Sequence, residues 1–473
     1  MQLFMPELTL IVMALSFFAM TLAKPKRGFL QGMALILSAV AVLAAVCAAC
    51  QSGSMFYDAY RIDGLSQMFK VLITFGLFLV IYMGSGLTGI TDALKAEYYF
   101  FLTLSALGLV FMVSAVELIT IVLCLEISSF AIYVLIPFRR HTLGRTQMEA
   151  GIKYILFGAA ATGITLYGMS YLFGLTHTTY LSGLAKAMPA LVAGKPIAVI
   201  AMVMMLTGFF YKLALFPMHF WAPDVYQGAA NETAGFVATL PKVGAVALLV
   251  RLVSLTGTDI TQLTWVLAAF AVISMTVGNF SALVQKDLKR VLAYSSIAHA
   301  GYMMVALLCA DQLGSVAAVY YVAGYLIMNL ACFFVIYHIA PEGGANVTFE
   351  DLKGLYKRAP LLAFTLAAGA FGMAGIPPTI GFTGKFLIFT AALQKGLYAL
   401  VILAVINAGI SAFYYLKMVR AAYAAPHEDT APAVQLTPCI KALGVLFIAL
   451  ILLMGALPQP FTQFVKDALA MAG

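Results

Sequence analysis

Residues 204–244 read MMLTGFFYKLALFPMHFWAPDVYQGAANETAGFVATLPKVG, which is two apolar runs joined by a short loop. Lys212 lies in the first run, Pro217 interrupts that run soon afterwards, and Lys242 lies in the second run. Even on lenient scales, a charged side chain at the centre of a bilayer costs about 2.5 kcal/mol or more. Two lysines on either side of a proline break therefore indicate a functional site.

The composition assigns the chain to the polytopic membrane proteins. Of its 473 residues, 63% are apolar and 10% are charged, and the mean hydropathy is +0.99, whereas soluble proteins carry about 25% charged residues. Lipid offers the backbone no hydrogen-bond partner, so long apolar runs must form helices and the expected fold class is all-α. The net charge of +8 fits basic loops on the cytoplasmic side of a bilayer, and no nucleic-acid partner is expected.

Motifs of soluble catalytic or metal-binding domains are absent from the sequence. There is no phosphate-binding glycine loop, no cluster of metal ligands and no nucleophile beside a base. Cys47 and Cys50 form a CxxC pair, but they lack a second pair and a nearby histidine. We interpret the cysteines as small apolar core residues and expect no metal site.

About fourteen transmembrane helices are expected, at roughly 20 apolar residues for each crossing. Basic clusters follow the first, fifth, ninth, eleventh and thirteenth spans, so all of them fall on one side of the membrane. By the positive-inside rule that side is cytoplasmic, and both termini are then on the outer side. The expected span centres are residues 14, 38, 77, 106, 127, 161, 207, 244, 273, 300, 326, 376, 408 and 447.

A second broken span follows in the other half of the chain, at residues 374–386 (AGIPPTIGFTGKF), with Lys385 beside it. Interrupted helices in corresponding positions of two halves indicate inverted repeats with a site near the membrane midplane. We therefore predict two inverted repeats of five helices, each with a proline-broken helix near Pro217 or Pro377. The expected division is a three-helix segment over 1–96, repeats over 97–258 and 259–425, and a terminal helix within 426–473.

Other ionisable residues fall inside or at the ends of the apolar spans. Glu126 is the one acid in the middle of its span, and it is either the partner of a buried lysine or a neutral carboxyl bonded to Ser128 or Ser129. Lys153 begins a span and can also reach the interface with its long side chain. His299 is surrounded by hydroxyl residues, and it is either a satisfied core histidine or a relay between lysines.

These residues suit proton transfer. Burial favours the neutral amine of a lysine, whereas a nearby carboxylate favours the ammonium, so a movable carboxylate lets a buried lysine bind and release protons. The hypothesis is a chain of proton carriers that crosses the middle of the membrane in the order Glu126, Lys212, Lys242, His299 and Lys385.

Three stretches carry a family resemblance. YKLALFPMHFWAPDVYQGA (211–229), VQKDLKRVLAYSSIAHAGYM (284–303) and AGIPPTIGFTGKF (374–386) resemble segments of the antiporter-like membrane subunits of respiratory complex I and of the cation/proton antiporters. The likeness extends over most of residues 60–425. It implies that Glu126 and Lys212 are the carboxylate–lysine pair of the family, Lys242 its connecting lysine and Lys385 its terminal lysine, with Lys153 and His299 at polar positions of the same axis.

The resemblance also implies a function. Such a chain is a proton-translocating membrane subunit of an NADH-quinone oxidoreductase in a bacterial cytoplasmic membrane, without a cofactor or redox site of its own. Quinone, iron–sulfur clusters and flavin are then expected in partner subunits. Its expected neighbours are a second antiporter-like subunit, small membrane subunits and the lipid bilayer. The alternatives are a subunit of a cation/proton antiporter, a subunit of a membrane-bound hydrogenase, and a structural anchor whose lysines only hold helices together.

The chain departs from the family after the first broken span, where a proline-rich turn is replaced by GAANETAG. This change places Glu232 shortly before Lys242. The acid is either a proton or cation site near the cytoplasmic mouth, or a residue that stabilises the start of a helix, where acids are favoured and where Asn231 is a good N-cap.

Overall fold

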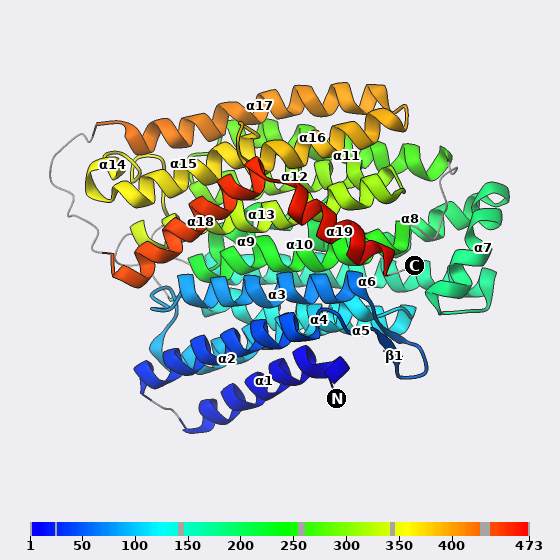
Figure 1. The fold of residues 1–473 in the computed structure, drawn as a ribbon, viewed down its shortest axis with the longest axis horizontal. Helices are drawn as coiled ribbons and strands as arrows, with labels where there is room; N and C mark the ends of the chain where they lie inside the picture. Colours follow the sequence, from blue (N-terminus) through cyan, green and yellow to red (C-terminus); the bar gives the residue numbers. More distant parts are fainter. Residues whose placement is uncertain are drawn as a thin grey trace.

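The chain folds into a bundle of helices that run roughly parallel to the long axis of the molecule (Figure 1). The structure is a computed structural model that describes residues 2–23, 26–140, 146–253, 261–340, 346–425 and 436–471. Within these ranges 13 helices are long and apolar enough to cross a membrane. A further pair of shorter apolar helices, α15 (Pro360–Ala374) and α16 (Ile380–Gln394), together occupies the remaining expected span. The predicted all-α polytopic fold is confirmed.

The first half of the chain contains most of the short irregular elements. A small antiparallel hairpin, β1 (Gly53–Met55) and β2 (Tyr60–Ile62), pairs Gly53 with Ile62 and separates α2 from α3. The helices are α1 (Met5–Ala23), α2 (Arg27–Ala48), α3 (Gly64–Met83), α4 (Lys95–Ser114), α5 (Leu118–Leu135), α6 (Thr146–Thr176), α7 (Leu181–Gly194), α8 (Pro196–Leu213) and α9 (Trp221–Gly228), with 3-10 turns η1 (Gln2–Phe4), η2 (Asp92–Leu94) and η3 (Ile136–Phe138).

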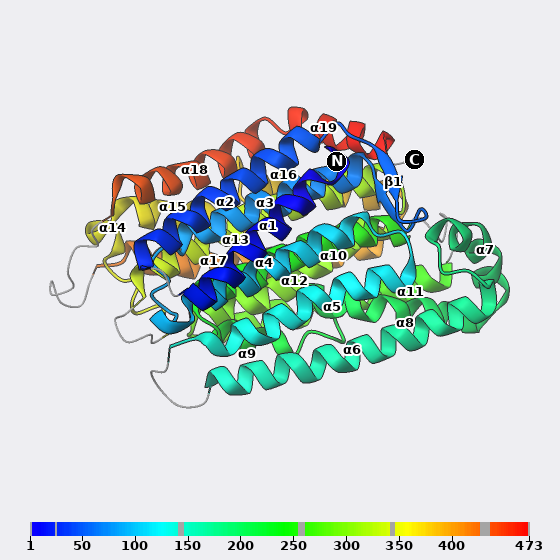
Figure 2. The same cartoon turned by 90° about the horizontal axis from the view of Figure 1, so that it is seen from below.

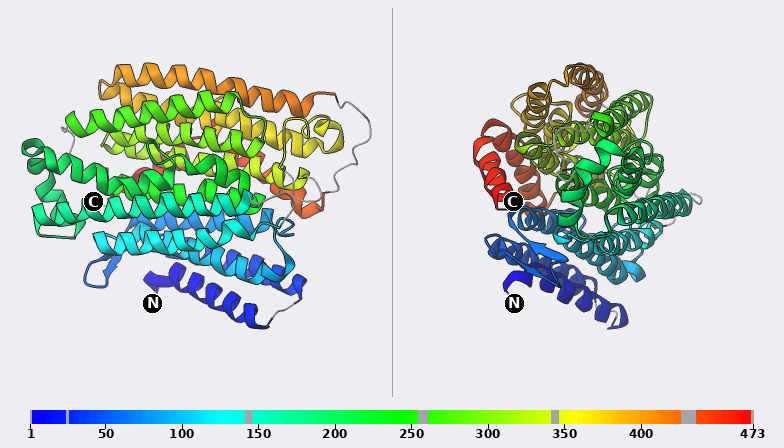
Figure 3. Two further views of the ribbon diagram at one scale, coloured as in Figure 1. Left: turned by 180° about the vertical axis from the view of Figure 1, so that it is seen from behind. Right: turned by 90° about the vertical axis from the view of Figure 1, so that its right-hand side faces the viewer.

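The second half contains the two most buried spans among the described residues, α10 (Asn231–Val253) and α13 (Gln312–Ile339). Its helices are α10, α11 (Thr261–Leu283), α12 (Leu288–Leu308), α13, α14 (Leu355–Arg358), α15, α16, α17 (Tyr398–Tyr423), α18 (Pro438–Ala456) and α19 (Gln459–Ala470). The most apolar windows of α10 and α13 are wholly buried, and these two helices pack against each other. By contrast, α1 and α17 lie on opposite sides of the bundle (Figure 3). The polar residues of α10 are therefore enclosed by protein rather than by lipid.

The two ends of the bundle differ in charge and in structure. The hairpin, α7 and both termini lie at one end, and α14 lies at the other (Figures 1 and 2). Three contacts lie at the α14 end. Arg139 binds Asn346, Asp287 pairs with Thr348, and Gly354 binds the residue that follows α17. We call this the basic end, since the arginines and lysines around residues 139, 289, 357 and 420 lie there. Lys24 and Arg145 of the predicted clusters lie outside the described residues.

Glycines allow the helices around the site to approach closely. An ideal Cβ built on Gly108 of α4 would lie 2.7 Å from the amide nitrogen of Ser128 and 2.9 Å from the carbonyl oxygen of Cys124, both in α5. No side chain larger than hydrogen fits between these backbones, as in many close helix pairs in membranes. The position of α5, and with it that of Glu126, therefore depends on this glycine.

Replacing this glycine tests the packing. We expect G108A to lower the free energy of unfolding by about 1–3 kcal/mol, because the added methyl group forces α4 and α5 apart. G163A is the matched control, since a Cβ on Gly163 in α6 has no neighbouring atom within 4 Å. Thermal unfolding of the purified protein in mild detergent measures both variants. Equal midpoints for G108A and G163A would contradict this packing.

Candidate functional site

The helix carrying Lys212 ends inside the bundle. Ala214 adopts a left-handed conformation with φ of 59°, and the amide of Leu215 donates to the carbonyl of Phe210 at 2.8 Å. This arrangement is a common helix stop, and Pro217, which has no amide hydrogen, cannot extend the helix. A helix end leaves its last carbonyl groups without intrahelical partners, and inside a membrane protein other groups must bind them.

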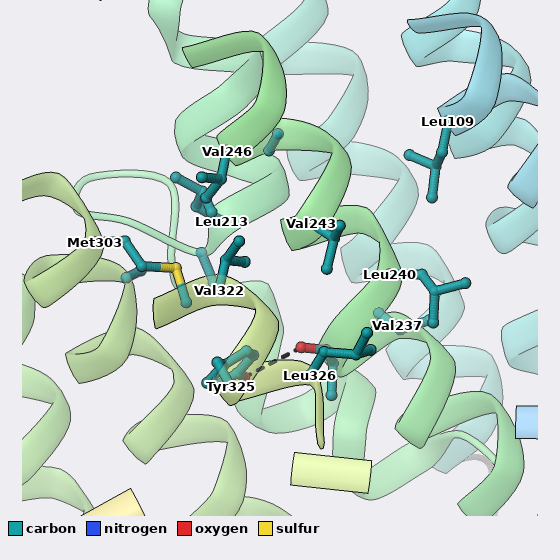
Figure 4. Packing of buried hydrophobic residues seen from close by; sticks show 14 of the residues in the cluster. Leu109, Leu213, Val237, Leu240, Val243, Val246, Met303, Val322, Tyr325 and Leu326 are labelled. Carbon is teal, nitrogen blue, oxygen red and sulfur yellow. Dashed lines mark hydrogen bonds between the residues drawn. The ribbon is translucent and has the colours of Figure 1, made fainter. Parts of the chain in front are cut away.

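Lys242 of α10 binds one of these carbonyl groups. Its fully buried ammonium donates to the carbonyl oxygen of Leu213 at 2.5 Å and to that of Ser296 at 3.4 Å, and it lies 5.9 Å from the centre of the Tyr325 ring. Figure 4 shows the apolar packing around this part of α10, including Leu213, Val243 and Tyr325. A cation is favoured at a helix C-terminus, where the helix dipole is negative. The broken end of α8 thus holds the positive charge of Lys242.

Lys212 and Glu126 interact at a distance. Lys212 is 1% exposed, and its ammonium has no hydrogen-bond partner among the described residues. The carboxylate of Glu126 attracts it electrostatically but accepts a hydrogen bond at 2.5 Å from Thr162 of α6. The alternative in which Glu126 bonds to Ser128 or Ser129 is not observed, because these hydroxyls bind Ser105 and the carbonyl of Leu125 instead.

The second break repeats this chemistry. Gly375 ends α15 with φ of 87°, and the amide of Ile376 donates to the carbonyl of Phe371 at 3.0 Å, in the same pattern as at the first break. Lys385 of α16 is 5% exposed, and its ammonium donates to the carbonyl groups of Met373 and Ala374, each at 2.9 Å. Both broken spans therefore present their carbonyl ends to a buried lysine.

His299 of α12 lies between the two lysine sites. Its Nδ1 is 2.6 Å from the hydroxyl of Tyr321, and its Nε2 is 2.9 Å from the hydroxyl of Tyr415. Both Lys242 and Lys385 act on the imidazole electrostatically. The imidazole is 2% exposed. The fold thus brings His299, Lys242 and Lys385 into one buried polar region, although they are far apart in the sequence.

Lys153 has a different environment. Its side chain is 37% exposed and forms ion pairs with Glu149 at 2.7 Å and with Asp224 at 2.6 Å. Asp224 also pairs with Arg290 at 2.8 Å. Although burial opposes it, hydrogen bonds from Lys153 and Arg290 hold the pKa of Asp224 below its usual value. Lys153 therefore belongs to a charged network at the basic end and not to the buried region around Lys242.

Sequence reasoning missed a buried ion pair in the N-terminal helices. Lys70 of α3 and Glu7 of α1 are both fully buried, with 2.6 Å between the ammonium and the carboxylate, and the hydroxyl of Tyr60 donates to the same oxygen at 2.6 Å. The available signal was one acid and one base in separate apolar spans. Asp63, the N-cap of α3, binds Arg251 of α10 at 2.6 Å and ties this segment to the central helix.

Known proteins and one protein family match this chain over most of its length. Residues 115–411 match the family described as NADH:quinone oxidoreductase/Mrp antiporter, TM. The chain is 47% identical over 464 residues to NADH-quinone oxidoreductase subunit N 2 of Solidesulfovibrio magneticus, covering 98% of this chain and 97% of that one. It is 44% identical over 468 residues to the subunit N 2 of Opitutus terrae, covering 99% and 97%.

A solved structure has the same fold. A chain of respiratory complex I from Thermus thermophilus with bound aureothin superimposes with a TM-score of 0.84 at 31% identity, covering 97% of this chain and 99% of that chain. The fourteen expected spans, the Pro377–Pro378 pair and a lysine at position 385 predict the subunit N branch of the family, and the named relatives confirm that prediction.

The network around Asp224 makes stability depend on pH. Because its pKa is lower in the folded protein, the ion pairs stabilise the fold above about pH 4, and this stabilisation is lost as the pH falls through the folded-state value. We expect D224N to lower the free energy of unfolding at pH 7 by about 1 kcal/mol or less, since the pairs are partly exposed. The difference from the unsubstituted protein should shrink below about pH 4.

Unfolding midpoints of the purified protein between pH 3 and pH 7 measure this effect. D467N is the control, because Asp467 is an exposed carboxylate of α19 bound only to Gln463 among the described contacts. A D224N deficit that stayed constant over the whole pH range would show that the loss does not come from ion pairing.

Proposed function

The chain belongs to the family of NADH:quinone oxidoreductase and Mrp antiporter membrane subunits, and we propose that its two broken helices carry protons across the membrane for an NADH-quinone oxidoreductase. The observation that carries this proposal is the pair of buried lysines held by the carbonyl ends of those helices, with His299 between them. Intramembrane ionisable residues are costly, and protons are the cargo that such residues exchange.

Lysine and histidine can each bind and release one proton. Lys242 and Lys385 are stabilised as ammonium ions by main-chain carbonyl groups and by the tyrosine rings beside them. Lys212 lacks such carbonyl contacts, and its positive charge depends on Glu126. A movement of Glu126 away from Lys212 would release a proton from that lysine, because the buried ammonium would lose its counter-charge.

The proposed order of transfer follows the geometry. Leu213, whose carbonyl binds Lys242, is the residue after Lys212, so these two lysines share the end of α8. We place His299 between Lys242 and Lys385, because both lysines act on its imidazole electrostatically and its two nitrogens contact tyrosine hydroxyls. We place Lys153 at the entrance, where its ion pair with Asp224 joins the surface to α9. The basic end is proposed to face the cytoplasm, and both termini the outer side.

In this proposal the oxidation and reduction steps take place elsewhere. Flavin, iron–sulfur clusters and quinone are assigned to partner subunits, and this chain adds proton transfer without a redox group of its own. A second antiporter-like subunit and small membrane subunits are the proposed neighbours within the bacterial cytoplasmic membrane. Exposed apolar side chains such as Phe130, Tyr167 and Phe413 offer surfaces for them or for lipid.

A second candidate function is cation/proton exchange, since the matched family description also includes Mrp antiporters. Relatives that cover nearly the whole chain at 44% and 47% identity are named as oxidoreductase subunits, which favours the first reading. Purification of the native assembly distinguishes them. Flavin, iron–sulfur absorbance and quinone reduction would support the oxidoreductase, and their absence from an intact assembly would support the antiporter.

Substituting Lys212 separates proton transfer from a structural role. We expect K212M to assemble normally, because methionine has a similar shape and the ammonium of Lys212 forms no hydrogen bond among the described residues. Proton translocation should fall by about a hundredfold, the lower end of what a positioned proton-transfer group contributes. K186M, at an exposed lysine of α7, is the control.

The measurement combines the amount of assembled complex with quinone reduction and proton uptake in membrane vesicles. A structural anchor predicts the opposite pattern, in which K212M reduces assembly and the remaining complex translocates protons at the full rate per molecule. That pattern would contradict the proposed function.

A further inference from the structure

We infer that Glu232 and Lys289 form a proton-entry pair at the basic end, which supplies protons to Lys242. This role rests on the proposed function and adds its first internal step. Glu232 lies in the segment where this chain lacks the proline-rich turn expected before α10. Lys289 lies in a basic stretch that is typical of a surface loop. The fold buries both residues.

The carboxylate of Glu232 is only partly satisfied. The side chain is 1% exposed, and its Oε1 accepts a hydrogen bond from the amide of Gly89 at 3.3 Å. Its Oε2 is buried and has no hydrogen-bond partner among the described residues. Buried polar atoms are nearly always bonded, and an exception calls for an explanation such as an exchangeable proton or an ordered water. The second oxygen of Glu232 is therefore available to receive a proton.

Lys289 supplies the opposite charge. It is fully buried in the first turn of α12, and its ammonium donates to the carbonyl of Ala229 at 2.8 Å, close in sequence to Glu232. A cation at a helix N-terminus is unfavourable, because the helix dipole is positive there. Burial and the nearby Arg139 also disfavour its ammonium form, whereas Asp287 and Glu232 attract Lys289 electrostatically.

Burial favours the neutral form of Glu232, whereas the positive charges of Lys289 and Lys95 on separate elements favour the carboxylate. These opposing effects allow the side chain both to take up and to release a proton. The charged and titratable groups that act on Glu232 or Lys289 are Lys95 and Tyr98 of α4, Arg139 after η3, and Asp287 before α12.

We place two hydroxyl groups between this pair and Lys242. Ser296 lies two turns after Lys289 on α12, about 10 Å along the helix axis, and its hydroxyl is 3.0 Å from that of Tyr226 in α9. The main-chain carbonyl of the same serine accepts a hydrogen bond from Lys242. The straight separation between Glu232 and Lys242 on α10 is about 15 Å. In this route the two hydroxyls lie between Glu232 and Lys242, and water must bridge the remaining distance.

The transfer balances without another reactant. A proton from the aqueous phase at the basic end binds the free oxygen of Glu232 and gives a neutral carboxylic acid. The acid then releases this proton through water and the hydroxyls of Tyr226 and Ser296 to the neutral amine of Lys242, which becomes an ammonium. The carboxylate is restored, and Lys289 gives up no proton in these steps.

A structural role for Glu232 makes a different prediction. Acids stabilise helix N-termini, and Glu232 is the second residue of α10. E232Q keeps a side-chain oxygen that can accept the hydrogen bond from Gly89, but it cannot exchange a proton. We expect E232Q to assemble and to translocate protons about tenfold more slowly. The loss is smaller than the hundredfold or more expected for a proton-transfer group that water cannot replace, because water can reach this end of the pathway.

The experiment uses the whole complex in inside-out membrane vesicles, so that the basic end faces the external buffer. Initial rates of proton uptake are measured in sodium-free buffer at external pH values from about 6 to about 8. Ordinary carboxylates are ionised over this range. E232D should retain most of the rate, and E350Q, at a mostly exposed acid of the same end, should match the unsubstituted complex.

Y226F is the second variant, since it removes only the intermediate hydroxyl and keeps the buried ring. It should slow proton uptake as E232Q does, and it decides the question if E232Q does not assemble. Full rates for both assembled variants, or for Y226F alone when E232Q is lost, would overturn the inference, as would a defect of E232Q that appears only when sodium is added. Loss of translocation in K212M together with full rates in E232Q and Y226F would leave the proposed function intact and reject the entry pair alone.

Discussion

The carbonyl ends of two helices that stop inside an apolar bundle are the constraint on which this structure depends. Backbone groups that lose their helical partners in a membrane protein must be bound by other protein groups or by water. Here lysines bind them, with Lys242 on Leu213 and Lys385 on Met373 and Ala374. Each lysine in turn needs those carbonyls, because a buried ammonium is costly without acceptors. The helix breaks and the buried cations thus stabilise each other.

The central helix α10 connects the charged groups of the molecule. It carries Glu232 near the basic end, Lys242 in its middle and Arg251 near the other end, where the guanidinium binds Asp63 of α3. Because α10 is enclosed by other helices, lipid cannot solvate these groups and each depends on a partner from a neighbouring helix. A shift of α10 relative to α8 or α12 would change the contacts of Lys242 with both helices together.

The sequence predicted the parts of the fold and of the site that depend on single conspicuous residues. A lone lysine or acid in an apolar run is visible without coordinates, which is why Lys212, Lys242, Lys385 and Glu126 could be selected, and prolines located both breaks. Burial of residues near helix ends was not predictable. Lys153 is partly exposed, whereas Lys289, in a run that reads as a basic loop, is fully buried. Partners such as Thr162 of Glu126 come from helix packing, which the sequence does not display.

The central claim is that a lysine held by a broken helix releases its proton during turnover. Lys242→Arg tests it most directly, because arginine keeps the positive charge and can donate to the carbonyl of Leu213, but it stays protonated. The measurement is the number of protons translocated for each electron pair by the purified complex in vesicles, with K186R at an exposed lysine as the control. The account predicts an assembled complex with a lower ratio. An unchanged ratio in the assembled Lys242→Arg complex would contradict it.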